Sequence, residues 1–224
     1  VTPGTPISVN TTPDLWTAIP GSSSPTNLLV PVTTRHQDVY YPHTFIHPVN
    51  GRPFYAATGL PGVDLQGQSC LFNPETLAWE SYAPIPNGFA NVRRAYPSSV
   101  MMDGIIYRSG GSRSDGQTAE AERVATKINL YDANPQWTSI DSMELTRKNH
   151  TLVALPDGRI VAMGGNVRAY IEQAKDRTTP EVYDTEVSNS EWRLLSPIPA
   201  NQPNQSARFG CLRRRLDTMF LLSD

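Results

Sequence analysis

The chain has 224 residues and a formal net charge of −2, with 19 Lys and Arg against 21 Asp and Glu. This balance argues against a general nucleic-acid partner, which would need a basic surface. No run of about 18 apolar residues occurs, so we expect no membrane span. The 20 Pro and 15 Gly favour many turns, and the length suits one all-β domain.

Residues 1–34 are rich in Thr, Ser and Pro and are predicted to form an N-terminal arm with an outer strand near Trp16. The chain starts with Val and has no apolar signal segment, so we expect a processed chain or a fragment. Triplets of the N-x-[ST] type at Asn10, Asn149 and Asn204 are compatible with a secreted, extracellular protein.

A hairpin pattern recurs after residue 34. Residues 41–59 read YPHTFIHPVNGRPFYAATG, residues 96–111 read YPSSVMMDGIIYRSGG, and residues 150–165 read HTLVALPDGRIVAMGG. Each stretch is an apolar run, a turn with Asn-Gly or Asp-Gly, and a second run that ends at glycine, which predicts two short strands. The closing glycines are 52 and 54 residues apart.

A second pattern follows each hairpin in phase. An aromatic residue with Asn or Asp precedes a tryptophan three times, as Phe72-Asn73 with Trp79, Tyr131-Asp132 with Trp137, and Tyr183-Asp184 with Trp192. We expect two outer strands here in every unit, with the tryptophans packed between neighbouring units. Four short strands in ~50 residues, closed by glycines, are typical of a kelch-type propeller blade.

The repeats therefore predict an all-β, kelch-type β-propeller over residues 35–224, with three complete four-stranded blades near 38–84, 94–143 and 148–198. Residues 208–224 would start a partial fourth blade, which the outer strands around Trp16 would complete if the two termini share it. Rings of this type generally have six or seven blades. We therefore favour part of a larger ring, completed by missing blades or other chains, over a closed four-bladed domain.

Strand parity places the tight turns at one end of the blades, the turn end. The long segments 112–127 and 166–180 and the crossings between blades lie at the other, the loop end. Because function usually resides on long loops held by a rigid scaffold, the ligand is expected at the loop end. In an alternative interpretation, the basic residues at the loop end have a structural role and pair with carboxylates or backbone carbonyls. The histidine there would then also be structural and hydrogen-bonded. The candidate binding residues are Arg94, Arg113, Arg147, His150, Arg168, Tyr170 and Arg208.

Other candidate sites are weak. His43 and His47 have the spacing of a metal pair on a helix, but on a strand they would stand ~13 Å apart and so could not share one ion. Cys70 and Cys211 lie in different repeats, and the sequence leaves open whether they are free thiols or a disulfide.

The repeats resemble the galactose oxidase and glyoxal oxidase branch of kelch propellers. The resemblance covers roughly residues 38–224, and its closest pieces are Arg94-Ala95-Tyr96-Pro97-Ser98-Ser99 and HTLVALPDG. It implies a radical copper site in which Tyr96 would be joined to a cysteine. No cysteine stands near Tyr41-Pro42, where that partner belongs, and Gly210-Cys211 replaces the family's Tyr-His ligand pair.

Two functions follow as expectations. The first is a non-catalytic, secreted propeller without a cofactor, which presents its loops to a protein or glycan partner. The alternative is a fragment of a copper-radical oxidase that acts on alcohols or aldehydes, with Tyr96 as its one recognisable catalytic residue. A copper site needs several ligands in a fixed geometry, and the sequence supplies only this one at the family's positions.

Overall fold

The computed structural model describes residues 14–17, 26–29, 43–56, 68–76, 78–84, 96–112, 120–167 and 178–197. Within these ranges the regular secondary structure consists of β-strands alone. Three antiparallel sheets have four strands each. The expected all-β class and the expected four-stranded units are confirmed for this part of the chain.

The strands follow the chain in order within each sheet. The first sheet has β3 (Thr44–Ile46), β4 (Pro53–Tyr55), β5 (Gln68–Asn73) and β6 (Ala78–Pro84). The second has β7 (Ser98–Met102), β8 (Ile105–Ser109), β9 (Ala125–Asn129) and β10 (Thr138–Ile140). The third has β11 (Thr151–Ala154), β12 (Arg159–Met163), β13 (Glu181–Asp184) and β14 (Arg193–Leu194).

The N-terminal arm contributes a separate hairpin. Strand β1 (Asp14–Thr17) pairs with β2 (Thr26–Leu29), and Trp16 lies opposite Asn27. A strand therefore exists where the sequence predicts one. Residues 208–224 lie outside the described part of the chain, so the fourth blade shared by both termini is not described.

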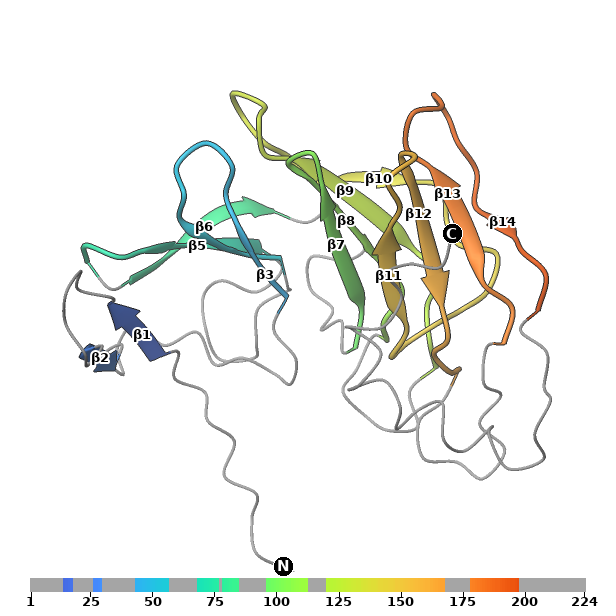
Figure 1. The fold of residues 1–224 in the computed structure, drawn as a ribbon, viewed down its shortest axis with the longest axis horizontal. Helices are drawn as coiled ribbons and strands as arrows, with labels where there is room; N and C mark the ends of the chain where they lie inside the picture. Colours follow the sequence, from blue (N-terminus) through green and yellow to red (C-terminus); the bar gives the residue numbers. More distant parts are fainter. Residues whose placement is uncertain are drawn as a thin grey trace, which may run out of the picture.

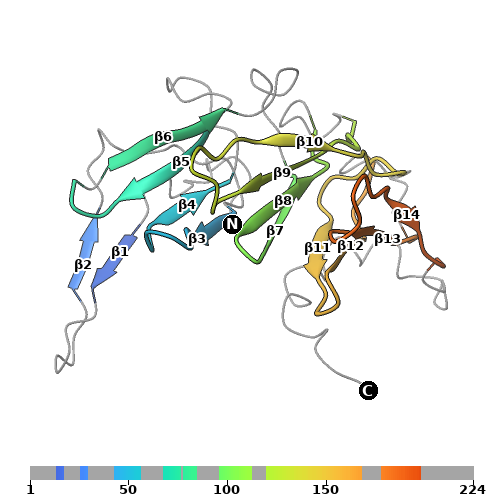
Figure 2. The ribbon, with the colours of Figure 1, turned by 90° about the horizontal axis from the view of Figure 1, so that it is seen from above.

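The three sheets stand side by side (Figure 1). Seen from above, their first strands β3, β7 and β11 lie towards one common interior, whereas β6, β10 and β14 lie along the periphery (Figure 2). The turns after β3, β7 and β11 all lie at the upper end in Figure 1, as strand parity predicts for the turn end. This arrangement is compatible with consecutive blades of a propeller.

The strand registers align the three sheets residue by residue. When the residue pairs are counted from the turn end, one pair between the second and third strands is equivalent in all three sheets. This pair is Tyr55 and Cys70 in the first sheet, Arg108 and Thr126 in the second, and Ala162 and Glu181 in the third. The first strands add Thr44, Ser99 and Leu152 to these rows. Equivalent positions therefore differ widely in charge.

The register corrects one detail of the expected aromatic pattern. Asn129 lies opposite Ile105 as Asp184 lies opposite Arg159, so Asn129 is the counterpart of Asp184. Its side-chain oxygen accepts a hydrogen bond from the backbone N–H of Tyr131 at 3.0 Å. The sequence pattern had placed Tyr131-Asp132 at this position. This hydrogen bond forms an Asx turn, which carries the chain out of the sheet before the tyrosine. Tyr131 is therefore 60% exposed.

Asx turns occur at the same point in the other two sheets. Asn73 accepts from the backbone N–H of Glu75 at 3.0 Å, and Asp184 accepts from that of Glu186 at 3.1 Å. Asn and Asp are favoured there because their short side chains hydrogen-bond the backbone two residues on. The repeated Asn or Asp therefore ends the third strand of each sheet.

Two apolar clusters fill the seams between sheets. In the first seam, Phe54 and Leu71 of the first sheet pack with Ile106, Ile128 and Trp137 of the second. The side-chain N–H of Trp137 also donates to Ser69 Oγ at 3.1 Å, across the seam. Trp137, which directly precedes the outer strand β10, thus packs against the neighbouring sheet, as expected from its repeat position.

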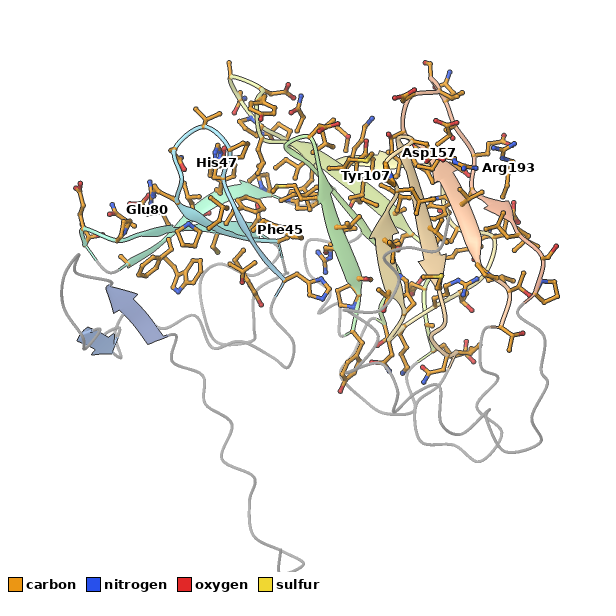
Figure 3. The ribbon with its side chains drawn as sticks, in the orientation of Figure 1. Phe45, His47, Glu80, Tyr107, Asp157 and Arg193 are labelled. Atoms are coloured by element: carbon orange, nitrogen blue, oxygen red, sulfur yellow. The ribbon has the colours of Figure 1, made fainter. Side chains whose placement is uncertain are left out.

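The second seam repeats this packing. Trp192, directly before β14, and Tyr183 of the third sheet share a cluster with Tyr107 of the second sheet and with Met143, which follows β10. The rings of Tyr107 and Tyr183 lie 6.2 Å apart, and Figure 3 shows Tyr107 between the two sheets. The backbone N–H of Trp192 donates to Asp141 Oδ2 at 3.1 Å. Trp79, in contrast, is only half-buried and packs on Phe72 within its own sheet.

Candidate functional site

The loop end of the second seam is the best described part of the expected ligand region. The crossing segment, residues 141–150, leads from β10 to β11. The backbone N–H of Gly111 donates to the carbonyl of Arg147 at 2.8 Å, and the N–H of Asn149 donates to the carbonyl of Tyr96 at 3.0 Å. The crossing segment is therefore hydrogen-bonded to the second sheet before it enters the third.

Arg147 lies in this segment with its side chain fully buried. Its Nε donates to Glu181 Oε1 at 2.9 Å, and its Nη1 donates to the carbonyl of Gly164 at 2.8 Å. Its Nη2 donates to the carbonyl of Thr179. Each guanidinium nitrogen thus has a partner inside the protein, which is the geometry of a structural ion pair.

Glu181 completes the arrangement from β13. Its Oε2 accepts from the backbone N–H of Glu144 at 2.6 Å, and its Oε1 also accepts from that of Leu145 at 3.1 Å. Buried charges are tolerated when they are paired and their remaining hydrogen-bonding capacity is used. One carboxylate therefore neutralises Arg147 and holds the crossing segment to the third sheet.

His150 follows in the same segment and is 4% exposed. Its Nε2 lies 2.9 Å from Ser109 Oγ of β8, so the imidazole bridges the second and third sheets. Space beside it is limited, because a Cβ on Gly110 would lie 2.6 Å from His150 Cε1 and 2.3 Å from the carbonyl oxygen of Arg147. A side chain at Gly110 would therefore collide with the crossing segment.

Tyr96 and Asn149 share an unusual backbone conformation. Their φ angles are 61° and 57°, in the left-handed region that residues other than glycine seldom adopt. The registers of β7 and β11 make the two positions equivalent, each two residues before the first strand of its sheet. Such strain persists only where the surroundings enforce it, and it is common at functional sites.

The other candidate binding residues lie outside the described part of the chain. They are Arg94, Arg113, Arg168, Tyr170 and Arg208. Sequence position makes Arg94 the counterpart of Arg147, because it precedes Tyr96 by the two residues that separate Arg147 from Asn149. Of the candidate binding residues, the structure describes Arg147 and His150, and it brings them together in one seam.

The two histidines with metal-pair spacing flank the extended strand β3. His47 Nε2 lies 2.7 Å from the hydroxyl of Tyr82 on β6, at the turn end of the first sheet (Figure 3). Burial, and secondarily the positive charge of Arg52, lower the pKa of His47. Cys70 is buried in β5, whereas Cys211 lies outside the described ranges. Within those ranges, no three His, Cys, Asp or Glu side chains gather as metal ligands.

Sequence reasoning missed a polar row in the first seam. Ser99, Arg108 and Thr126 lie side by side on β7, β8 and β9. Arg108 is 1% exposed and Thr126 is also 1% exposed. The one available signal was the charge of Arg108 inside the apolar run IIYRS, because a strand buried on both faces rarely carries an arginine.

Comparison with known proteins assigns no family. No protein-family description matches the chain, and no curated protein matches it. Among the residues that the structure describes, no helix is long and apolar enough to cross a membrane.

Proposed function

We propose that this protein is a kelch-type β-propeller that works without catalysis, as a secreted scaffold whose loop end binds a protein or a glycan. The phased hairpins and tryptophans support the fold, together with three adjacent four-stranded sheets that pack through two of those tryptophans, Trp137 and Trp192. In this proposal the three units that the structure describes belong to a ring of six or seven blades, which further blades or other chains complete.

The observation that carries the functional proposal is the use of polar groups at the second seam. Arg147 and His150 hold one sheet to the next through Glu181 and Ser109. Side chains used in this way build a rigid support, and rigid supports commonly present variable loops for recognition. We therefore assign partner contacts to the long loops, through Arg113, Arg168 and Tyr170.

The test uses the purified chain on an immobilised panel of neutral and acidic oligosaccharides. We expect binding that is lost in the double variant Arg168→Ala/Tyr170→Ala. Arg159→Ala, which alters an exposed residue at the turn end, should bind as the unmodified chain does. Binding that survives the loop variant and disappears in Arg159→Ala would place recognition at the wrong end and overturn the assignment.

The second candidate is a fragment of a copper-radical oxidase, and Tyr96 is the observation that favours it. Tyr96 stands at the loop end in a strained conformation, at the position that the resemblance gives to the radical tyrosine. The donor set does not fit the metal, because Gly210-Cys211 replaces the ligand pair and no cysteine lies near Tyr41-Pro42. We derive no copper chemistry for this chain.

Metal analysis separates the two candidates. We expect no stoichiometric copper after incubation with Cu²⁺ and dialysis, and no peroxide from primary alcohols or aldehydes. Copper bound at one per chain, together with peroxide that disappears in Tyr96→Phe, would instead establish the oxidase.

A further inference from the structure

The row formed by Ser99, Arg108 and Thr126 faces the first sheet. Directly paired residues of an antiparallel sheet point to the same face, and Arg108 is paired with both other members. Ile106, two residues before Arg108 on the same strand, packs in the first seam with Phe54. Because side chains alternate along a strand, Arg108 enters that seam too.

Arg108 is a buried cation with unused donors. Its Nε and Nη2 are inaccessible to solvent and have no hydrogen-bond partner, and the same holds for Ser99 Oγ beside it. Burial lowers the pKa of Arg108 to about 10, so the guanidinium is still protonated at neutral pH. An isolated charge of this kind is costly unless a counter-charge and hydrogen bonds accompany it.

The equivalent row of the third sheet shows how the protein solves the same problem elsewhere. There the row reads Leu152, Ala162 and Glu181, and the carboxylate of Glu181 neutralises Arg147. In the second sheet Thr126 stands in place of the acid and Arg108 in place of the alanine. That row therefore has donors and a positive charge but no acceptor of opposite charge.

We propose that this row binds a small monovalent anion of the chloride class in the first seam, with Arg108 and the hydroxyl of Ser99 as its donors. One guanidinium charge matches one negative charge. The anion must also be small, because the seam around it is filled by apolar side chains such as Phe54 and Trp137. The site is independent of the partner proposed for the loop end.

Thermal unfolding in sodium chloride and in sodium gluconate at equal ionic strength tests the proposal. Gluconate is too large to enter a closed seam. With saturating chloride we expect the midpoint of the unmodified chain to rise by about 5–10 °C over its value in gluconate. Arg108→Met should abolish this difference, whereas the surface control Arg159→Met should retain it.

Equal midpoints in the two salts, or a chloride increment that survives in Arg108→Met, would overturn the proposal. A carboxylate of the chain itself in the seam would give the first of these results. If Arg108→Met does not fold, crystals of the unmodified chain grown in sodium bromide decide the matter. An anomalous peak within hydrogen-bond distance of Arg108 Nε or Nη2 supports the site, and its absence contradicts it.

Discussion

The two seams between the described sheets are built alike but are charged differently. Each has a tryptophan, directly before an outer strand, in an apolar cluster with residues of both sheets. In the second seam the buried cation Arg147 is paired with Glu181. In the first seam the buried cation Arg108 has unpaired donors.

In this chain the repeats therefore preserve shape more strictly than polarity. Apolar contacts need only suitable volumes at each position, so every repeat meets them with similar residues. A buried charge needs a specific partner, which a neighbouring repeat supplies in one seam and not in the other. We therefore expect the stability of the first seam, and not that of the second, to depend on the anion in the solution.

The largest effect is expected in the second seam. Glu181→Gln removes the charge that compensates Arg147 and should lower the free energy of unfolding by ~3–5 kcal/mol, as for a broken buried ion pair. Urea denaturation followed by tryptophan fluorescence measures the change.

Two further variants sharpen this result. Asp157→Asn breaks an exposed ion pair with Arg159 and should change nothing measurable. Arg147→Met/Glu181→Leu should be more stable than Glu181→Gln, because it leaves no buried charge without a partner. A Glu181→Gln chain as stable as the unmodified one would remove the contrast between the seams.

The apolar part of the comparison is tested by the tryptophans. Trp137→Ala removes a 4% exposed side chain from the first seam and should cost ~3–5 kcal/mol. Trp79→Ala should cost clearly less, because that indole is half-buried. Equal losses of stability in thermal or urea unfolding would show that the tryptophans do not stabilise the chain through the seams.

Two equivalent glycines allow a test of how closely the crossing segment packs on the second sheet. Gly110 and Gly164 are equivalent in the repeat and have similar φ angles of 63° and 67°. A Cβ at Gly110 would strike the backbone of Arg147 at 2.3 Å, whereas a Cβ at Gly164 meets nothing within 4 Å.

Gly164→Ala should therefore show only the ~1–2 kcal/mol cost of a left-handed residue. Gly110→Ala should cost more, because the backbone of the crossing segment must also move. Unfolding midpoints measured side by side give the difference, and the opposite order would contradict the packing of the crossing segment on Gly110.

The smallest effect concerns pH and the first sheet. Because folding lowers the pKa of His47 below its ordinary value of 6.5, the unfolded chain binds the proton more readily. The contribution of neutral His47 to the free energy of unfolding is therefore full above pH 6.5 and is lost as the pH falls below that value.

His47→Gln should flatten the decline of the unfolding free energy on acidification, and Arg52→Gln should flatten it less, because burial is the larger cause of the shift. Stability measured by urea titration between pH 7.5 and 5 would show this. An unchanged slope in His47→Gln would assign the acid sensitivity to other groups.

Local patterns were sufficient to predict most of the described strands. Alternating apolar runs, Asn-Gly and Asp-Gly turns and phased tryptophans are short-range signals, and each marks a strand or turn in the structure. They failed at Tyr131-Asp132, where a tyrosine followed by an aspartate suggested the wrong register. Ile128-Asn129 occupies that position because the Asx turn, and not the aromatic ring, ends the strand.

Those local patterns could not predict which charged residues are buried or which partners they have. Arg147 resembles a binding residue in the sequence, but Glu181, 34 residues later, turns it into an internal ion pair. Arg108 stands out in the sequence only as a charge inside an apolar run, and it becomes a buried cation because the first sheet closes over its face. Strand formation depends on neighbours along the chain, whereas burial and charge compensation depend on which distant strands pack together. The amino-acid order alone therefore specified the repeating β-units, and the packing of one sheet on the next specified which of their charges are paired.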